Sequence, residues 1–405
     1  MAKKLKKFLL YIGIAIFTIL LGFFIVGSIV ESPVFALRIL AWGTSDTGDI
    51  ARFHARTIDR GDSVFSLPSE PGTVPQYVTY IYNAEPKTEN LQELILRTDT
   101  KAFVIIKDDK IMMQVYHDSE YQTPQTSFSV AKVFSSALIG TAIADGYIYS
   151  VDDLVIKYVP EIAGRGLDSL TIKNLLRMDT GIKYIPNDER PFYEHPFADD
   201  ALTYYSTDLR KTALSVEASG TEIGESFRYN NYHPLLEGLI LERATGIPVA
   251  EYLSERIWKP MGAEYAASWS IDSTHSGFEK MESGLNAAAV DFARFGLLYL
   301  HKGRLNGAQI LPQEWVVESS TPDPSDNRLF ETMSDYPSYG GFYGYHWWGL
   351  KNPDGSFDYA ASGNLGQIIY IAPQENMVIV RFGNEKDSNV YWILVLQALV
   401  DQMSR

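Results

Sequence analysis

An uncharged apolar run near the N-terminus is the feature that most constrains what this chain can form. Residues 8–30 read FLLYIGIAIFTILLGFFIVGSIV, 23 residues without a charge, and they follow the lysine-rich start MAKKLKK. As a helix rising about 1.5 Å per residue, the run extends roughly 34 Å, enough to cross a hydrocarbon core of about 30 Å. A buried core helix is the alternative, but four lysines directly before the run disfavour it. The sequence predicts a transmembrane helix over 8–30.

The charges beside this run predict its orientation. Lysines cluster on the cytoplasmic side of membrane helices, so residues 1–7 are expected to be a cytoplasmic basic tail. The rest of the chain would then be periplasmic or extracellular, in a protein that crosses the cell membrane once. A signal peptide cleaved after Ser28 is the competing interpretation, although the apolar part of a signal peptide usually spans only about 7–15 residues. Both interpretations predict export.

Composition removes several classes of function. The chain has no cysteine, which excludes disulfides, zinc-thiolate sites and thiol catalysis. It holds 35 basic and 50 acidic residues, and four of the basic ones lie in the first seven positions. Residues 8–405 therefore carry 31 positive and 50 negative groups, a net charge of −19. Such a body repels phosphate backbones, so no nucleic-acid partner is expected.

The exported part divides into two segments. Residues 31–75 hold Pro, Gly, Ser and Asp at short intervals, which predicts a linker or packing arm. Its apolar side chains between Val34 and Trp42 could pack on the next domain or on the bilayer surface. Residues 76–405 are expected to form one α/β (α+β) domain.

Apolar periodicity predicts how this domain is built. Paired short apolar runs at 102–106 with 111–116, and at 367–372 with 377–382, indicate two β-hairpins. Helices are predicted between them and after them, at 129–145, 234–256, 287–301 and 389–403. Strands at both ends and helices in the middle predict an antiparallel sheet built from the two chain ends, flanked by helices, with a helical insertion.

Ser129 and Lys132 are the first candidate catalytic pair. In a helix, residues i and i+3 share a face, so the hydroxyl and the amine would be neighbours. A serine hydroxyl is a poor nucleophile until a base accepts its proton, and a lysine can be that base when partial burial or a nearby cation lowers its pKa. By chance, a chain of this length would also contain one or two such S-x-x-K patterns.

Two further motifs gain weight from their order. Tyr229 and Asn231 form the only Y-x-N of the chain, in which a tyrosine can serve as a general base and an asparagine can hold a lysine. Residues 361–367, ASGNLGQ, lead into the strand at 367–372, and small residues there would let a substrate approach closely. Alone, each of these patterns is also typical of an ordinary turn.

Other candidates are weaker. The seven histidines form no H-E-x-x-H or H-x-H-x-D pattern, so no metal site is expected, and the chain lacks the G-x-S-x-G of α/β-hydrolases. Phosphate-binding glycine loops are also lacking, and no cofactor is predicted. His346 and Trp347 could line a substrate pocket, with a packed or exposed aromatic loop as the alternative. The aromatic stretch at 192–197 is either a substrate-covering loop or a surface turn.

The order of the three motifs resembles the plan of serine β-lactamases and penicillin-binding proteins. S-x-x-K comes first, Y-x-N follows about 100 residues later, and small-x-Gly stands before a terminal strand. The chain is most similar to the class C β-lactamase-type family, especially its esterase and 6-aminohexanoate-oligomer hydrolase branch. The resemblance covers roughly residues 76–403. It includes the segments LTIKNLLRMDTGI (170–182), GESFRYNN (224–231), IWKPMGAE (257–264) and YGYHWW (343–348).

This resemblance implies a β-lactamase/transpeptidase-like fold and a role for each motif. Ser129 would be the acylated nucleophile and Lys132 would share its proton. Tyr229 would act as base for attack and as acid for the leaving group, and Asn231 would orient Lys132. The backbone N–H groups of Ser129 and Asn364 would form the oxyanion hole, with Ala361, Ser362 and Gly363 beside the substrate.

One departure from the family pattern narrows the range of expected substrates. The third motif commonly begins with Lys or His, and here that position is Ala361. A cation there would attract the carboxylate of a penicillin, so a small-molecule ester or amide without that carboxylate is the better expectation. The alternatives are a D,D-peptidase or β-lactamase acting near the cell wall, and a non-catalytic binding or sensor ectodomain of the same fold.

Overall fold

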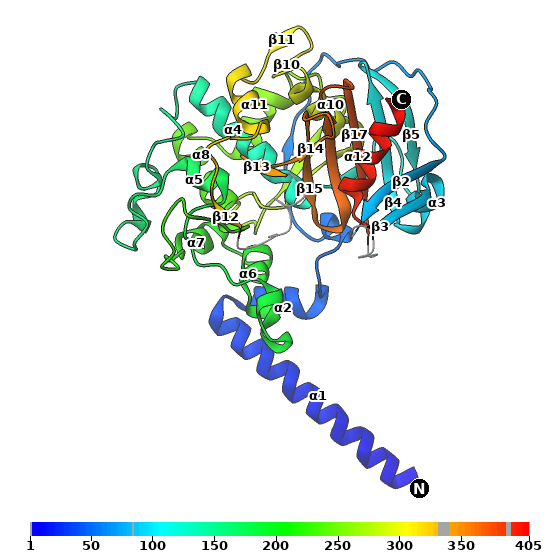
Figure 1. Cartoon of the computed structure of the whole chain (residues 1–405). Helices are drawn as coiled ribbons and strands as arrows, with labels where there is room; N and C mark the ends of the chain where they lie inside the picture. The colour runs from blue at the N-terminus through cyan, green and yellow to red at the C-terminus, as the bar shows by residue number, and fades with distance from the viewer. Residues whose placement is uncertain (1, 83–84, 331–340, 386–389, 405) are drawn as a thin grey trace.

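A seven-stranded antiparallel sheet organises the main domain (Figure 1). The computed structural model describes residues 2–82, 85–330, 341–385 and 390–404. Its strands follow the spatial order β13 (Phe342–Gly344), β14 (Trp347–Lys351), β15 (Phe357–Gly363), β16 (Gln367–Ala372), β17 (Met377–Gly383), β4 (Thr100–Lys107) and β5 (Lys110–Tyr116). Both predicted hairpins are therefore confirmed, as β4–β5 and β16–β17.

The two ends of the domain meet inside this sheet. Strand β17 pairs with β4, so that Val380 lies opposite Val104 and the C-terminal hairpin continues the N-terminal one. Side chains alternate between two cores: Val104 packs with the helices α4 and α10, whereas Phe103 packs with α12. Because both faces are covered, the strands are almost continuously apolar. This arrangement confirms the predicted antiparallel sheet that is built from the two chain ends and flanked by helices.

The helices lie on the two sides of the sheet and in the insertion. The predicted helices are α4 (Ala131–Ala144), α8 (Tyr232–Thr245), α10 (Ala289–Leu300) and α12 (Trp392–Met403), and the prediction for 389 lies outside the described residues. The helix predicted over 234–256 is interrupted, because Gly246 caps α8 with a φ of 74° and Pro248 precedes α9 (Val249–Leu253). The smaller helices are α3 (Leu91–Arg97), α5 (Ile172–Arg177), α6 (Asp199–Tyr205), α7 (Leu209–Leu214) and α11 (Gln313–Ser320).

A second, four-stranded sheet leads the chain to Ser129. Its antiparallel order is β1 (Ala55–Ile58), β8 (Ala267–Ser270), β9 (Leu285–Ala288) and β6 (Pro124–Thr126). Strand β1 belongs to the segment 31–75, which also contains α2 (Pro33–Trp42), so this segment includes regular structure and packs on the main domain. Short pairs complete the described strands: β2 (Tyr77–Tyr82) with β3 (Glu85–Asn90), β10 (Arg304–Leu305) with β11 (Ala308–Gln309), and β7 (Ser226–Phe227) with β12 (Leu329–Phe330).

The N-terminal helix α1 (Ala2–Val30) projects from the main domain (Figure 1). Residues 3–30 are long and apolar enough to cross a membrane, and the most apolar part of this span has no buried residue. Membrane anchors and signal sequences share these properties.

Candidate active site

A strained turn presents Ser129 at the start of α4. The backbone N–H of Ser127 donates to the carbonyl of Leu285 at 2.8 Å, which ties the end of β6 to β9. Phe128 then has a φ of 43°, a left-handed conformation that costs a non-glycine residue roughly 1–3 kcal/mol. Its buried ring, stacked 6.5 Å from that of Tyr204, helps to hold this conformation. The chain continues through a short 3-10 turn (Phe128–Val130) into α4.

Lys132 reaches back to Ser129 from the first turn of α4. Its Nζ donates to the Ser129 Oγ at 2.9 Å and to the carbonyl oxygen of Glu282 at 3.1 Å. The lysine is buried, whereas the serine is partly exposed. Proton transfer between two groups needs a hydrogen-bond separation of about 2.6–3.2 Å, which this pair satisfies.

Tyr229 completes the group on the other side of Lys132. The lysine Nζ lies 4.9 Å from the centroid of the tyrosine ring. The ring stacks on Trp348 of β14, with centroids 5.8 Å apart. An aromatic wall therefore holds the tyrosine beside the amine, and the structure brings Ser129, Lys132 and Tyr229 together.

Asn231 points toward the helical insertion. Its Nδ2 donates to the hydroxyl of Tyr184 at 3.0 Å and, at a longer 3.4 Å, to the Oγ1 of Thr203 on α6. Burial raises the pKa of Tyr184, and its hydroxyl donates to Asp200 at 2.5 Å. Within the described residues, Asn231 has no hydrogen bond to Lys132. The asparagine links the Y-x-N motif to α6.

The third motif approaches Ser129 closely. Gly363 ends β15 beside the turn that carries Ser129. A Cβ built on this glycine would lie 2.5 Å from the carbonyl oxygen of Ser127 and 3.1 Å from the backbone nitrogen of Ser129. Only a glycine permits this approach. Ser362 is partly exposed beside it, Asn364 is exposed at the start of the following turn, and Ala361 is buried in the core shared with α4.

His346 and Trp347 lie behind this site and are enclosed. The Nε2 of His346 lies 2.8 Å from Glu237 Oε1 of α8, and the other carboxylate oxygen accepts from Ser135 at 2.6 Å. Trp347 is fully buried against Tyr299 and Tyr359. Both side chains are buried in this structure, and a substrate-binding role for them stays a prediction.

Sequence reasoning missed several residues that support the site. Glu237 is a carboxylate inside the apolar stretch LLEGLIL of α8, and a lone charge there is a signal for a buried partner. Trp348 is next to Trp347 in the sequence but was not itself predicted to line the site. No signal distinguished Tyr184 or Thr203, which come from the insertion whose conformation the sequence leaves open.

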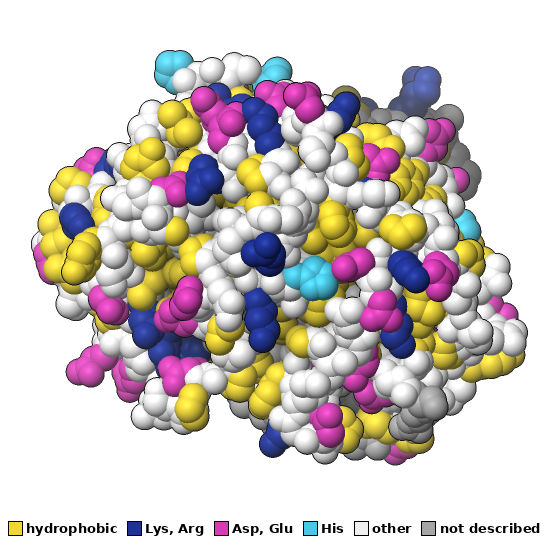
Figure 2. Space-filling view, turned by 90° about the horizontal axis from the view of Figure 1, so that it is seen from above, with side chains coloured by type: hydrophobic (Ala, Val, Ile, Leu, Met, Phe, Trp, Pro, Cys, Tyr) yellow, Lys and Arg dark blue, Asp and Glu magenta, His cyan; other side chains and the backbone are white. Residues whose placement is uncertain are grey.

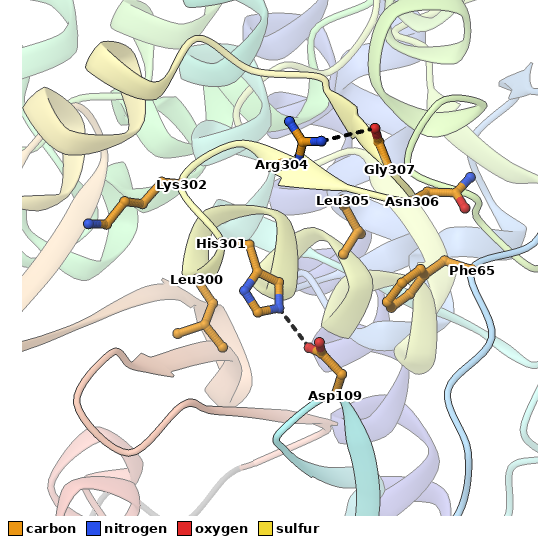
Figure 3. Close-up of a pocket in the computed structure, with 9 residues that line it drawn as sticks. All are labelled: Phe65, Asp109, Leu300, His301, Lys302, Arg304, Leu305, Asn306 and Gly307. Atoms are coloured by element: carbon orange, nitrogen blue, oxygen red, sulfur yellow. Dashed lines mark hydrogen bonds and ion pairs between the residues drawn. The ribbon is translucent and has the colours of Figure 1, made fainter.

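The hollow shown in Figure 3 lies elsewhere on the molecule. Phe65, Asp109, His301 and Arg304 are among its lining residues, and His301 pairs with Asp109 at 2.6 Å. None of the predicted site residues lines it. Another hollow, of about 380 Å³, is lined by Ser362, Gly363 and Asn364 together with the start of α12. Across residues 2–82, 85–330, 341–385 and 390–404, no group of three or more His, Asp or Glu could hold a metal ion.

Comparisons with known proteins agree with this geometry. The family model described as Beta-lactamase matches residues 97–401. The chain is 25% identical over 344 residues to the 6-aminohexanoate-dimer hydrolase of Paenarthrobacter ureafaciens, which covers 83% of this chain and 86% of that protein.

Solved structures show the same relationship. A structure described as "Putative 6-aminohexanoate-dimer hydrolase from Bacillus anthracis" superposes with a TM-score of 0.74 at 25% identity, over 93% of this chain and 94% of that one. The octameric penicillin-binding protein homologue from Pyrococcus abyssi has a TM-score of 0.59 at 20% identity, over 78% and 76% of the two chains, which shows the shared fold alone.

Proposed function

The chain belongs to the beta-lactamase family and is a serine hydrolase, and we propose that it hydrolyses an ester or amide through an acyl-enzyme on Ser129. The observation that carries the proposal is the 2.9 Å hydrogen bond between Lys132 Nζ and Ser129 Oγ, with the Tyr229 ring against the same amine. These are the groups that a nucleophilic serine needs in order to lose its proton.

The proposed reaction has two halves. The Ser129 hydroxyl passes its proton to the Lys132–Tyr229 pair while Oγ bonds to the substrate carbonyl carbon. The oxyanion receives hydrogen bonds from the backbone N–H groups of Ser129 and Asn364, and Tyr229 gives a proton to the departing alcohol or amine. Water, deprotonated by the same groups, then attacks the carbonyl carbon of the ester on Ser129, the bond to Oγ breaks, and the proton passes to Oγ as the acid is released.

The absence of a cation at Ala361 favours substrates without a recognition carboxylate. Ala361 is 1% exposed and contributes no charge to the site. We therefore place a D,D-peptidase or β-lactamase activity second. The other alternative is a non-catalytic binding or sensor ectodomain of the same fold, which would either not acylate or acylate without turnover.

We also propose that α1 anchors the protein in the cell membrane, with residues 1–7 in the cytoplasm and residues 31–405 outside. The apolar helix and the four lysines before it support this topology. Residues 76–405 would be the hydrolase domain and residues 31–75 its connection to the membrane.

Labelling of the active serine tests the hydrolase proposal. The full chain in lipid nanodiscs is treated with a fluorophosphonate probe and, separately, with a fluorescent penicillin, and the labelled peptide is identified by mass spectrometry. We expect fluorophosphonate on Ser129 and little penicillin. Strong penicillin labelling with slow release would favour the peptidase branch. A folded protein labelled by neither would contradict an activated serine.

A further inference from the structure

The helix α2 exposes a face without charges. Its sequence, PVFALRILAW, contains one charged residue, Arg38, and that residue is buried. Val34, Leu37 and Leu40 are 50%, 53% and 39% exposed. A surface helix of a water-soluble domain carries polar side chains on its outer face, so contact of this apolar face with water is unfavourable.

The inner face of α2 is fixed to the main domain. Arg38 donates from Nη1 to the carbonyls of Tyr205 and Ser206, each at 3.0 Å, and from Nη2 to the carbonyl of Asp272 at 2.6 Å. Phe35 is fully buried in a small cluster with Tyr205. The helix therefore cannot rotate to hide its apolar face, and the main domain determines where that face points.

The helices α1 and α2 meet at the level where α1 would leave the bilayer. If Lys7 marks the inner boundary, about 20 residues at 1.5 Å each span the hydrocarbon core and place the outer boundary near Gly27. Gly27 packs against α2 so closely that an added Cβ would lie 2.9 Å from the Cβ of Ala36. In Figure 1, α2 lies crosswise between the end of α1 and α6.

The aromatic stretch at 192–197 lies at the same level. Its Phe197 ring contacts Phe23 of α1, with centroids 5.3 Å apart. Phe192 and Tyr193 are 85% and 74% exposed. Aromatic residues are enriched at membrane–water interfaces. Figure 2 shows the molecule from above the view of Figure 1. On that face, by contrast, Lys, Arg, Asp and Glu side chains are scattered among the apolar ones.

From these observations we propose that the outer face of α2 and the aromatic pair of 192–193 form a membrane seat that rests in the outer leaflet of the bilayer crossed by α1. An amphipathic helix binds an interface by burying its apolar side about 5–10 Å deep. The proposal rests on the membrane anchor proposed above and adds that the catalytic domain is held on the bilayer surface.

The seat fixes the position of the active site relative to the membrane. Trp42 of α2 contacts Tyr205, with ring centroids 6.3 Å apart, and the adjacent Tyr204 stacks on Phe128 beside the nucleophile. A short series of rigid aromatic contacts therefore joins the seat to the turn of Ser129. A flexible tether after α1 would leave the distance and tilt of the site undefined.

Single-cysteine labelling tests the seat, because the natural chain has no cysteine. Full-length Leu37→Cys is labelled with an NBD fluorophore and reconstituted in phosphatidylcholine nanodiscs with or without a mixture of two lipids, one carrying a shallow and one a deep doxyl quencher. Val317→Cys, on α11 and 41% exposed, is the matched control, and Ile19→Cys, 70% exposed on α1, reports the anchor. We expect about a twofold or larger loss of fluorescence at 37 and at 19 and almost none at 317.

The other outcomes separate the two proposals. Quenching at 19 without quenching at 37 would overturn the seat and leave the anchor intact. No quenching at 19 would overturn the anchor on which the seat depends. Equal quenching at 317 and 37 would also overturn the seat, since every exposed site would then meet lipid. Thermal melting of each labelled variant shows that it remains folded.

Discussion

Replacing Gly363 by Ala should disable the proposed oxyanion hole while the fold survives. The new Cβ would lie 2.5 Å from the carbonyl oxygen of Ser127, whereas ordinary contacts begin near 3.4 Å. The end of β15 would therefore have to retreat by close to 0.9 Å from the turn of Ser129. A displacement of about 1 Å at a reacting group costs roughly 100-fold in rate, similar to the loss of one oxyanion donor.

The assay is steady-state hydrolysis of a soluble p-nitrophenyl ester by full-length protein in nanodiscs. We expect kcat to fall about 100-fold with little change in KM, because the donors act on charge that develops in the transition state. Gly355→Ala, in the turn at the other end of β15, is the control: its φ of 89° makes the change mildly destabilising, but no atom lies within 4 Å.

A second variant keeps the oxyanion-hole prediction testable if Gly363→Ala fails to fold. Asn364→Pro removes the proposed donor itself, and Gly363 already has the extended backbone, with φ of −130° and ψ of 159°, that a residue before proline prefers. If both variants melt like the parent and keep kcat within about threefold, against the 100-fold expected for a lost donor, the proposed oxyanion hole is refuted.

Three other changes probe the site and its surroundings. Ser129→Ala should abolish ester hydrolysis with little change in melting temperature, and retained turnover would refute the nucleophile. Glu237→Gln should lower the free energy of unfolding by about 2 kcal/mol in urea titrations, because it weakens buried hydrogen bonds to His346 and Ser135; an unchanged midpoint would contradict this. Burial raises the pKa of Asp358 to about 6. The folded state therefore binds more protons than the unfolded state between about pH 4 and 6. Through this carboxyl, the free energy of unfolding falls by about 2–3 kcal/mol as pH rises across that range. Asp358→Asn should remove that part of the pH dependence, and parallel stability curves for variant and parent would contradict the assignment.

The features predicted correctly from the sequence were local ones. The hairpins at 100–116 and 367–383 follow from short apolar runs, and Ser129 and Lys132 share a face because they lie three positions apart in the sequence. Gly246 and Pro248 are residue types that end helices, but the apolar periodicity on both sides of them favoured one long helix.

What sequence reasoning missed depended on register and on distant segments. Trp347 and Trp348 are neighbours on β14, so they face opposite sides of the sheet, and only Trp348 reaches Tyr229. Choosing between them required the strand register, which no local pattern supplies. The partners of Asn231 come from residues 184 and 203, whose approach depends on how the whole insertion folds.

The relative position of Ser129 and Lys132 depends on more than their shared helix face. One short segment holds both: the Glu282 carbonyl accepts from Lys132, and the Ser283 and Leu285 carbonyls accept from Ser127.

That segment is itself fixed by a buried ion pair. The Nζ of Lys280 lies 2.9 Å from Glu282 Oε1, which also accepts from the Ser283 hydroxyl at 2.7 Å. Burial lowers the pKa of Lys280, and the carboxylate opposes that shift. The pair therefore positions the carbonyl to which Lys132 donates without touching Ser129. Two side chains that no motif includes thus help to set the separation on which the proposed proton transfer from Ser129 depends.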